Sequence, residues 1–397
     1  MSLDMTVGGY LRLAATEGVL DEGSASARQL DALLHATPNE GYADLAGATH
    51  FHGIAAYVHD ALNRHPQVPE DTREHVRQLR DRAAFNHLRT LADLAYLERV
   101  LDGGVPWLIV KGPTLAEPVH GSAQRRSYGD LDAVVPARFL AAALEALESS
   151  GSTLTDRNWT LIAEEMKGEV HLQLPSGGRL DLHWHLFNDR ARRKLFPVSI
   201  DALFERSRTV PVSGRPVPTL SFPDTVVYIA IHTMHSGGHR LIWLKDLERL
   251  LAHPDCDPAA VVERAREWRA ELVLTSAIRR VELALGTPPH ATAIRAAARR
   301  HLLWDLFATL VWRRHPAERE DGRGSLGRIV SRSIRPTQRQ SFQELGRRTY
   351  RHLRGRHEHG GDESGRLSSD DPRSDRFASG GTSAKEGFLS RVAHPGS

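Results

Sequence analysis

The sequence predicts an α+β fold, in which a small mixed β-sheet lies between two groups of helices. Apolar residues recur at three-to-four spacing in residues 1–104 and again in residues 221–312, which is the period of amphipathic helices. Between them, residues 105–220 carry short apolar runs that alternate with polar residues, as strands do. We therefore expect three folded regions, 1–104, 105–220 and 221–312, followed by an arginine-rich extension at 313–356 and a tail at 357–397.

The two outer regions carry the helical pattern most clearly in two stretches. Residues 72–101 form a long amphipathic pattern that stops at Asp102-Gly103-Gly104, because glycine ends helices. In the second group, Leu241, Leu244 and Leu247 repeat at helical spacing. We expect helices on both sides of the sheet.

The central region begins with four elements that alternate in type. An apolar strand at 107–110 precedes a short helix near 114–119, and a strand at 130–135 precedes a helix at 136–149. This order predicts strands supported by short helices.

A hairpin follows, with strands at 169–174 and 179–186 joined by Pro175-Ser176-Gly177-Gly178. Both strands alternate, so each has one apolar face and one polar face. The polar face carries Glu169, His171, Gln173, Arg179, Asp181, His183 and His185. We expect the apolar face to be buried and the polar face to line a site.

Bulk composition narrows the class of protein. The chain has 397 residues, 40% of them hydrophobic, and Cys256 is its one cysteine, which excludes a disulfide framework and a cysteine zinc site. The first residues lack the pattern of a signal peptide, and no apolar run reaches the roughly 18 residues that span a bilayer. We expect a cytoplasmic protein without a membrane partner; its oligomeric state is not readable from the sequence.

The C-terminal part differs in composition. Residues 313–356 hold thirteen arginines against four acidic residues. One interpretation of such a segment is that it binds nucleic acid through the phosphates. Aromatic residues are sparse in it and no base-reading module is present, so we favour a solvated basic extension. Residues 357–397 are rich in Gly, Ser, Asp and Arg, and we expect them to be disordered.

Asp130 and Asp132 open the second predicted strand, on either side of Leu131. Because a strand has period two, both carboxylates lie on one face. Two carboxylates held a few ångströms apart repel each other unless a cation lies between them. The pair predicts a divalent-metal site; a solvated turn, favoured by Gly129, is the alternative.

Asp181 is the best candidate for a third carboxylate. It lies on the polar face of the later hairpin between two apolar residues, where a lone aspartate is costly. The alternative is a surface residue of an edge strand. His183 and His185 share this face, where they either line the site or satisfy hydrogen bonds of the strand.

Metal-dependent nucleotidyl transfer needs carboxylates that hold the metal. It also needs positive charge that binds the triphosphate and a backbone segment that phosphate can approach. Lys111-Gly112 follows a buried strand and supplies both, unless the lysine simply reaches water. Arg125 and Arg126 precede Asp130 by five and four residues, and this spacing favours Arg126 as a phosphate contact.

Histidines in the C-terminal helices raise a zinc alternative. His232, His235 and His239 have i, i+3, i+7 spacing, but Gly237-Gly238 interrupts the helix before His239. Helix packing is the favoured interpretation. For Asp246 we expect a structural role beside a nearby polar group.

Taken together, these motifs resemble those of the bacterial uncharacterised nucleotidyltransferase family, in the DNA polymerase β-like superfamily. The resemblance covers roughly residues 75–290. It is carried by strand-Lys-Gly at 107–112, an arginine four residues before Asp-x-Asp, Asp181-Leu182-His183-Trp184, Phe222-Pro223-Asp224, the helix with His232 and His235, and residues 240–247.

The resemblance implies a nucleotidyltransferase core with Asp130, Asp132 and Asp181 as a metal triad and with Lys111, Gly112 and Arg126 or Arg125 at the phosphates. It implies Mg²⁺ or Mn²⁺ as cofactor, an NTP, with ATP the first choice, as substrate, and transfer of an NMP to a hydroxyl acceptor. The wider superfamily has Gly-Ser or Gly-Gly where this chain has Gly112-Pro113-Thr114. A non-catalytic nucleotide-binding or regulatory member is therefore the alternative.

Overall fold

The computed structural model describes residues 5–16, 18–21, 23–37, 42, 44–314, 325–355 and 382–394. The chain folds into two compact units, and each is described by itself. Unit 1 comprises residues up to His87, Leu115–Tyr128 and Phe222–Thr349, and unit 2 comprises Leu88–Thr114, Gly129–Ser221 and the residues from Tyr350.

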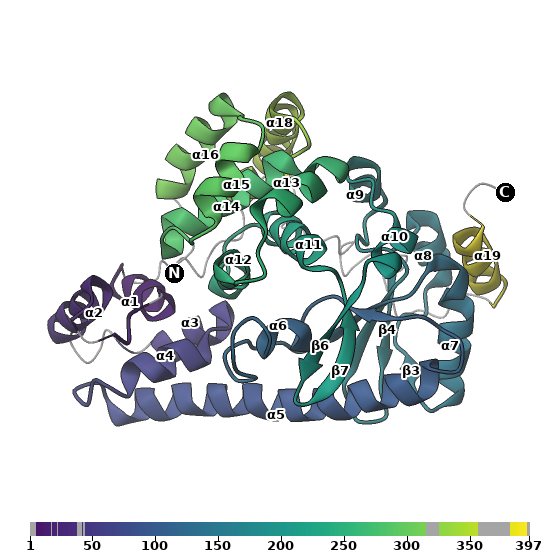
Figure 1. The fold of residues 1–397 in the computed structure, drawn as a ribbon, viewed down its shortest axis with the longest axis horizontal. Helices are drawn as coiled ribbons and strands as arrows, with labels where there is room; N and C mark the ends of the chain where they lie inside the picture. The colour runs from purple at the N-terminus through teal and green to yellow at the C-terminus, as the bar shows by residue number, and fades with distance from the viewer. Residues whose placement is uncertain are drawn as a thin grey trace. The chain divides into compact units, whose positions relative to one another are not determined.

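Unit 1 is helical (Figure 1). Its centre is formed by α11 (Phe222–His235), α12 (Leu241–Ala252) and α14 (Glu271–Leu285). These helices carry apolar side chains on more than one face, so they are covered by other helices on several sides, and almost all of their apolar residues are buried. The helices of this unit are α1 (Met5–Ala15), α2 (Ala25–Ala36), α3 (Leu45–His52), α4 (Ala55–Leu62), the first part of α5 (Glu70–Leu101), α11 (Phe222–His235), α12 (Leu241–Ala252), α13 (Pro258–Glu267), α14 (Glu271–Leu285), α15 (Ala291–Ala297), α16 (Leu302–Arg314), α17 (Leu326–Arg332) and most of α18 (Gln338–Gly355).

Unit 2 is built on a seven-stranded mixed sheet in the order β3-β4-β5-β2-β1-β7-β6. The pairs β2–β5 and β1–β7 are parallel, and the other neighbours are antiparallel. The strands are β1 (Leu108–Ile109), β2 (Leu131–Val134), β3 (Thr153–Leu154), β4 (Glu169–Gln173), β5 (Arg179–His183), β6 (Arg208–Val212) and β7 (Arg215–Thr219).

One face of this sheet carries the core of unit 2. Leu131, Ala133, Leu180 and Leu182 alternate inward from β2 and β5 and are at most 1% exposed. The helical elements of the unit are residues 88–101 of α5, α6 (Pro113–Ala116), whose last two residues belong to unit 1, η2 (Ala137–Phe139), α7 (Leu140–Ser149), α8 (Trp159–Glu165), α9 (Arg190–Leu195), α10 (Ile200–Glu205) and α19 (Thr382–Ala393). Figure 1 shows α7, α8 and α19 gathered beside β3 and β4.

The predicted α+β class, with a mixed sheet and flanking helices, is confirmed. The hairpin β6–β7 and the short strand β3 were not predicted. Pro211, Pro216 and Pro218 lie within that hairpin, and proline argues against a strand in a sequence. The hairpin is tolerated because β6 is an edge strand and β7 meets β1 only at Ile109↔Thr219.

The expectation of disorder over residues 357–397 needs a correction in one part. Residues 357–381 and 395–397 lie outside the described residues, but Thr382–Ala393 form α19. Phe388 and Val392 are four residues apart, lie on one helix face and are at most 1% exposed. Two apolar anchors are enough to dock this helix on the core, although the composition around them is polar.

Within the described ranges, no helix combines the length and the apolar character that a bilayer-crossing segment needs.

Candidate active site

The polar face of the sheet places the predicted carboxylates side by side. Asp132 on β2 and Asp181 on β5 are partners in the parallel register, and Asp181 is in turn the partner of His171 on β4. Neighbouring strands lie about 4.8 Å apart. The three side chains therefore form one row across the sheet, directly opposite the apolar core.

Two further rows flank this one. His183 is the register partner of Glu169, and the two side chains approach to 3.2 Å between Nδ1 and Oε2. On the other side, Asp130 precedes β2, and Nη2 of Arg179 donates a hydrogen bond of 3.4 Å to its Oδ2. The polar face thus carries alternating acidic and basic groups.

Asp132 is enclosed by two cationic or hydrogen-bonding groups. Nζ of Lys111 lies 2.5 Å from its Oδ2, and Nε2 of His183 lies 3.3 Å from its Oδ1. Burial alone would raise the pKa of this carboxyl, but Lys111 and His183 outweigh that effect and hold the pKa below its usual range. Asp132 is therefore ionised although it is only 2% exposed.

The pKa of Asp181 is shifted in the opposite direction to that of Asp132. Burial raises its pKa to about 6, His171 counteracts part of this rise, and the nearby charges of Asp132 and Asp130 add to it. Its Oδ1 atom is buried without a hydrogen-bond partner among the described residues, and the nearest imidazole nitrogen, Nε2 of His171, is 3.6 Å away. This oxygen is an acceptor without a donor.

His171 connects Asp181 to Asp156. Its Nδ1 lies 2.5 Å from Oδ2 of Asp156, which also accepts from the His171 backbone N–H at 3.0 Å. Burial would lower the pKa of His171, but the neighbouring carboxylates outweigh it and the pKa is raised. The strand alternation places Glu169 and His171 on the polar face, but the sequence indicates no individual role for them and none for Asp156. The predicted four-residue turn would pair His171 with Leu182, whereas the structure pairs Gln173 with Arg179 and so places His171 opposite Asp181. Asp156 lies outside any predicted strand.

Lys111 and Gly112 follow β1 at the edge of this face. Gly112 has φ of 76°, in the left-handed region that favours glycine, and it is buried. The turn sends the chain from β1 into α6 and leaves the Lys111 side chain directed at Asp132.

A sequence model of the uncharacterised nucleotidyltransferase family matches residues 39–286. The chain belongs to this family. The matched range contains all seven strands and the carboxylates described above. The search of curated proteins and the search of solved structures returned no match.

Arg125 and Arg126 of this nucleotidyltransferase belong to unit 1, where both contact carboxylates. Arg126 donates from Nε and Nη2 to Asp246 at 2.7 and 2.9 Å, and it is buried. Nη2 of Arg125 lies 3.5 Å from Oδ2 of Asp60. The phosphate contact that we expect from one of these arginines stays a prediction, and for Arg126 it requires exchange of Asp246 for phosphate.

Asp246 has the structural surroundings that we expected for it. His120 donates from Nε2 to its Oδ1 at 2.8 Å, and Tyr57 lies 2.8 Å from the other His120 nitrogen. Burial would raise the pKa of Asp246, but Arg126 and His120 outweigh it and lower the pKa to about 2. Asp246 is thus a buried carboxylate with three hydrogen bonds.

The other candidate histidines have packing roles. Nε2 of His235 lies 3.2 Å from the carbonyl of Ile334, and His239 stacks edge-on against Trp243 with 5.2 Å between ring centroids. Burial, together with nearby arginines, lowers the pKa of His239 to about 2. Nδ1 of His185 accepts the backbone N–H of Phe187, and burial lowers the pKa of His185 to about 3.

The fit of a divalent metal rests on donor chemistry. The described residues contain no group of three or more His, Cys, Asp or Glu already arranged around a metal position. The polar face nevertheless offers carboxylate oxygens from Asp130, Asp132 and Asp181, the donors that Mg²⁺ and Mn²⁺ prefer. The unpartnered Oδ1 of Asp181 is an oxygen that such an ion would satisfy.

Proposed function

We propose that this nucleotidyltransferase moves an NMP from an NTP to a hydroxyl acceptor, a small molecule or a protein side chain, and releases pyrophosphate. Asp130, Asp132 and Asp181 would hold Mg²⁺ or Mn²⁺, and ATP is the proposed NTP. The observation that supports this most strongly is the register pairing of Asp132 with Asp181, whose Oδ1 atom has no donor among the residues that the structure describes.

The reaction forms a bond between the acceptor oxygen and the α-phosphorus and breaks the bond from the α-phosphorus to the bridging oxygen of the β-phosphate. The metal, when bound, would neutralise phosphate charge and lower the pKa of the acceptor hydroxyl. Asp181, whose pKa is raised to about 6 in the metal-free protein, is still largely ionised at neutral pH and is therefore available as a metal ligand.

Lys111 would serve the phosphates by exchanging partners. Its ammonium is paired with Asp132, and a metal at Asp132 would compete for the same oxygen. The released ammonium then has a charge partner in the pyrophosphate leaving group. Gly112 has no side chain to block a phosphate that approaches the backbone.

Calorimetry with MgATP tests the metal assignment. The double variant Asp130→Asn/Asp132→Asn is expected to weaken MgATP binding at least tenfold. The matched control is Asp201→Asn/Glu145→Gln, which removes two carboxylates that are exposed elsewhere on unit 2 and should bind as the parent does. EDTA should abolish binding to the parent protein. Equal affinity of the parent and the Asp130/Asp132 variant for MgATP would remove the metal site.

The second candidate is a nucleotide-binding or regulatory member without transfer activity. One observation favours it: both oxygens of Asp132 already have protein partners, Lys111 and His183. Release of pyrophosphate from labelled NTPs, with a cell extract as the source of acceptors, separates the two. Sustained nucleotide binding without label transfer favours the regulatory role.

A further inference from the structure

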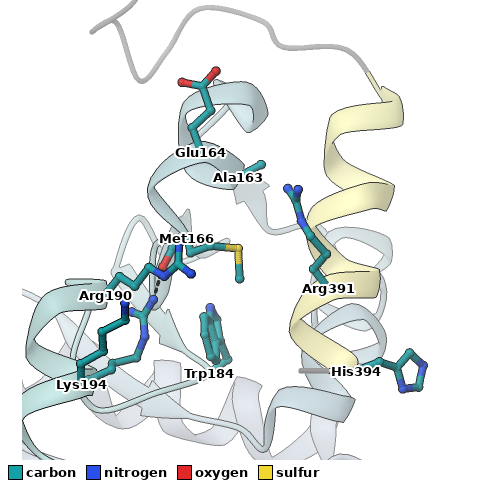
Figure 2. A pocket seen from close by; sticks show the side chains of 9 residues that line it. Ala163, Glu164, Met166, Trp184, Arg190, Lys194, Arg391 and His394 are labelled. Atoms are coloured by element: carbon teal, nitrogen blue, oxygen red, sulfur yellow. Dashed lines mark hydrogen bonds between the residues drawn. The ribbon is translucent and has the colours of Figure 1, made fainter. Parts of the chain in front are cut away.

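A second candidate site lies on unit 2, in a pocket of about 610 Å³ that has no part in the chemistry above. Its walls come from α8 with Met166, from α9 and from the C-terminal end of α19, with Trp184 between them (Figure 2). We call it the basic pocket. It is lined by Ala163, Glu164, Met166, Trp184, Arg190, Arg193, Lys194, Arg391 and His394.

The charge of the basic pocket is strongly one-sided. Four cationic side chains face a single carboxylate, Glu164. Arg190, Lys194 and Arg391 make no ion pair or hydrogen bond with any residue in the part of the chain that the structure describes. Figure 2 shows Arg190 and Lys194 on one side of the pocket and Arg391 on the other. Like charges that converge on one cavity repel each other, and an anion between them removes that cost.

Arg193 makes this arrangement rigid. Its Nη1 donates to the carbonyls of Phe187 and Asn188 at 2.9 and 2.6 Å, its Nη2 donates to the carbonyl of Met166, and its guanidinium lies 4.8 Å from the Trp184 ring centroid. Arg193 therefore ties α9 to the C-terminal end of α8 and to residues 187–188. Arg190 and Lys194 flank it in the same helix, at three residues before and one after, so the tie also fixes their backbone positions.

Trp184 and α19 fix the remaining walls. Nε1 of Trp184 donates to the carbonyl of Lys167 at 2.7 Å. Phe388 of α19 packs on Trp159 with ring centroids 5.8 Å apart, and Nζ of Lys385 lies 2.8 Å from a carboxylate oxygen of Glu148. The helix that carries Arg391 is therefore anchored by both an apolar contact and an ion pair.

The basic pocket is separate from the carboxylate row. His183 contacts Asp132 on the polar face, whereas Trp184, the next residue, packs against the apolar core of unit 2. Consecutive residues at the end of a strand point to opposite faces. A ligand in the basic pocket would therefore bind without touching the proposed metal ligands.

We propose that the basic pocket binds a small organic phosphate. Arginine presents a planar fork of donors that matches phosphate oxygens, and cations on two opposed walls suit a ligand with phosphates at both ends or with one phosphate shared between the walls. Met166 and Trp184 supply an apolar surface between the cations for the carbon skeleton of the ligand. A cavity with three walls and this volume favours a small molecule over a nucleic-acid strand.

Titration calorimetry in EDTA tests the proposal, because chelation removes any metal-dependent phosphate binding at the carboxylate row. The probes are fructose 1,6-bisphosphate, inorganic phosphate and citrate at constant ionic strength. We expect the bisphosphate to bind more tightly than inorganic phosphate, and citrate to bind at least tenfold more weakly than the bisphosphate. Equal binding of citrate and the bisphosphate overturns the phosphate class, and no binding of any probe overturns the site.

Variants locate the binding. Arg190→Gln/Arg391→Gln should weaken bisphosphate binding at least tenfold. The control Arg138→Gln/Arg157→Gln removes the same charge from exposed positions of unit 2 outside the pocket and should change the affinity less than twofold. Arg391→Lys keeps the charge and the fold and should retain most of the affinity. Loss of binding in the control to the same degree as in the pocket variant shows a diffuse surface effect and refutes the basic pocket.

Discussion

The ammonium of Lys111 and the carboxylate of Asp132 form an ion pair of 2.5 Å at the end of β1, with 16% and 3% of their side-chain surfaces exposed. The pair joins the two motifs that the sequence places eighteen residues apart, Lys111-Gly112 and Asp130-Leu131-Asp132. It also means that the proposed phosphate ligand and the proposed metal ligand neutralise each other. Binding of a metal–nucleotide complex would replace one such pair by two, Asp132 with the metal and Lys111 with phosphate.

Replacement of Lys111 by methionine is expected to destabilise the metal-free protein by about 3 kcal/mol, because a buried carboxylate loses its cation. The double variant Lys111→Met/Asp132→Asn should recover more than half of this loss. Urea denaturation in EDTA measures both. Additive losses in the double variant would show that the two residues do not depend on each other.

Asp181 should make the stability of the metal-free protein fall as pH rises from about 4 to about 6. Its pKa is raised from 3.8 to about 6 in the folded protein, so the folded state holds a proton that the unfolded state has lost in this window. The loss amounts to about 3 kcal/mol at most. Asp181→Asn should remove this part of the pH dependence, and it should abolish transfer activity.

Chemical denaturation across pH 4–7 in EDTA tests this prediction, with Asp189→Asn, which alters an exposed helix-capping carboxylate of the same unit, as control. A parallel pH profile for Asp181→Asn and the parent would contradict the raised pKa.

Asp246 should have the opposite effect on stability in acid. Its pKa is lowered to about 2, so its contribution is complete above the unfolded pKa near 4 and is lost as pH falls from about 4 toward 2. Asp246→Asn at neutral pH leaves Arg126 buried beside a neutral amide and is expected to cost about 3–5 kcal/mol. Thermal unfolding followed by circular dichroism measures this cost, with Glu263→Gln, an exposed charge of unit 1, as control. A loss below about 1 kcal/mol would argue against a buried ion pair.

Phe388→Ala should destabilise unit 2 by about 3–5 kcal/mol, because it removes a fully buried aromatic side chain from the core. Hydrogen exchange should increase in α8, which α19 contacts through Trp159 and Phe388. Ser390→Ala, on an exposed position of the same helix, is the control. Unchanged exchange in α8 would mean that α19 does not dock there in solution.

Much of the fold was predictable because its helices and central strands follow simple periods. The period-two argument put Asp132 and Asp181 on polar faces, and the register of β2 with β5 makes them neighbours. Their roles stay predictions. A hairpin pattern restricts the pairing of its two strands to a few registers, but a parallel pairing such as β2–β5 joins distant segments and leaves no local signal in the sequence.

Other parts were not predictable for identifiable reasons. Asp156 reaches His171 from an irregular segment, where no period indicates the direction of a side chain. The spacing of Arg126 to Asp130 predicts a phosphate contact, which stays a prediction, but its ion pair with Asp246 joins residues 120 positions apart and has no signal in the sequence. The hairpin β6–β7 was not predicted, because its prolines disfavour strands. The contacts of Asp156 and Arg126 join segments distant in the sequence, whereas the hairpin is a local pairing that its prolines hide.

The helices of unit 1 separate α19 from the strands of unit 2 in the sequence, and this order has a consequence for biosynthesis. The strands of unit 2 are complete at Thr219, but Phe388 and Val392, which fill its core, are added only after the C-terminal helices of unit 1. Until then, the nascent protein exposes the apolar patch around Trp159 that α19 later covers. Unit 2 therefore reaches its final packing only after α19 has left the ribosome, and a chain cut before α19 would leave a surface that chaperones recognise.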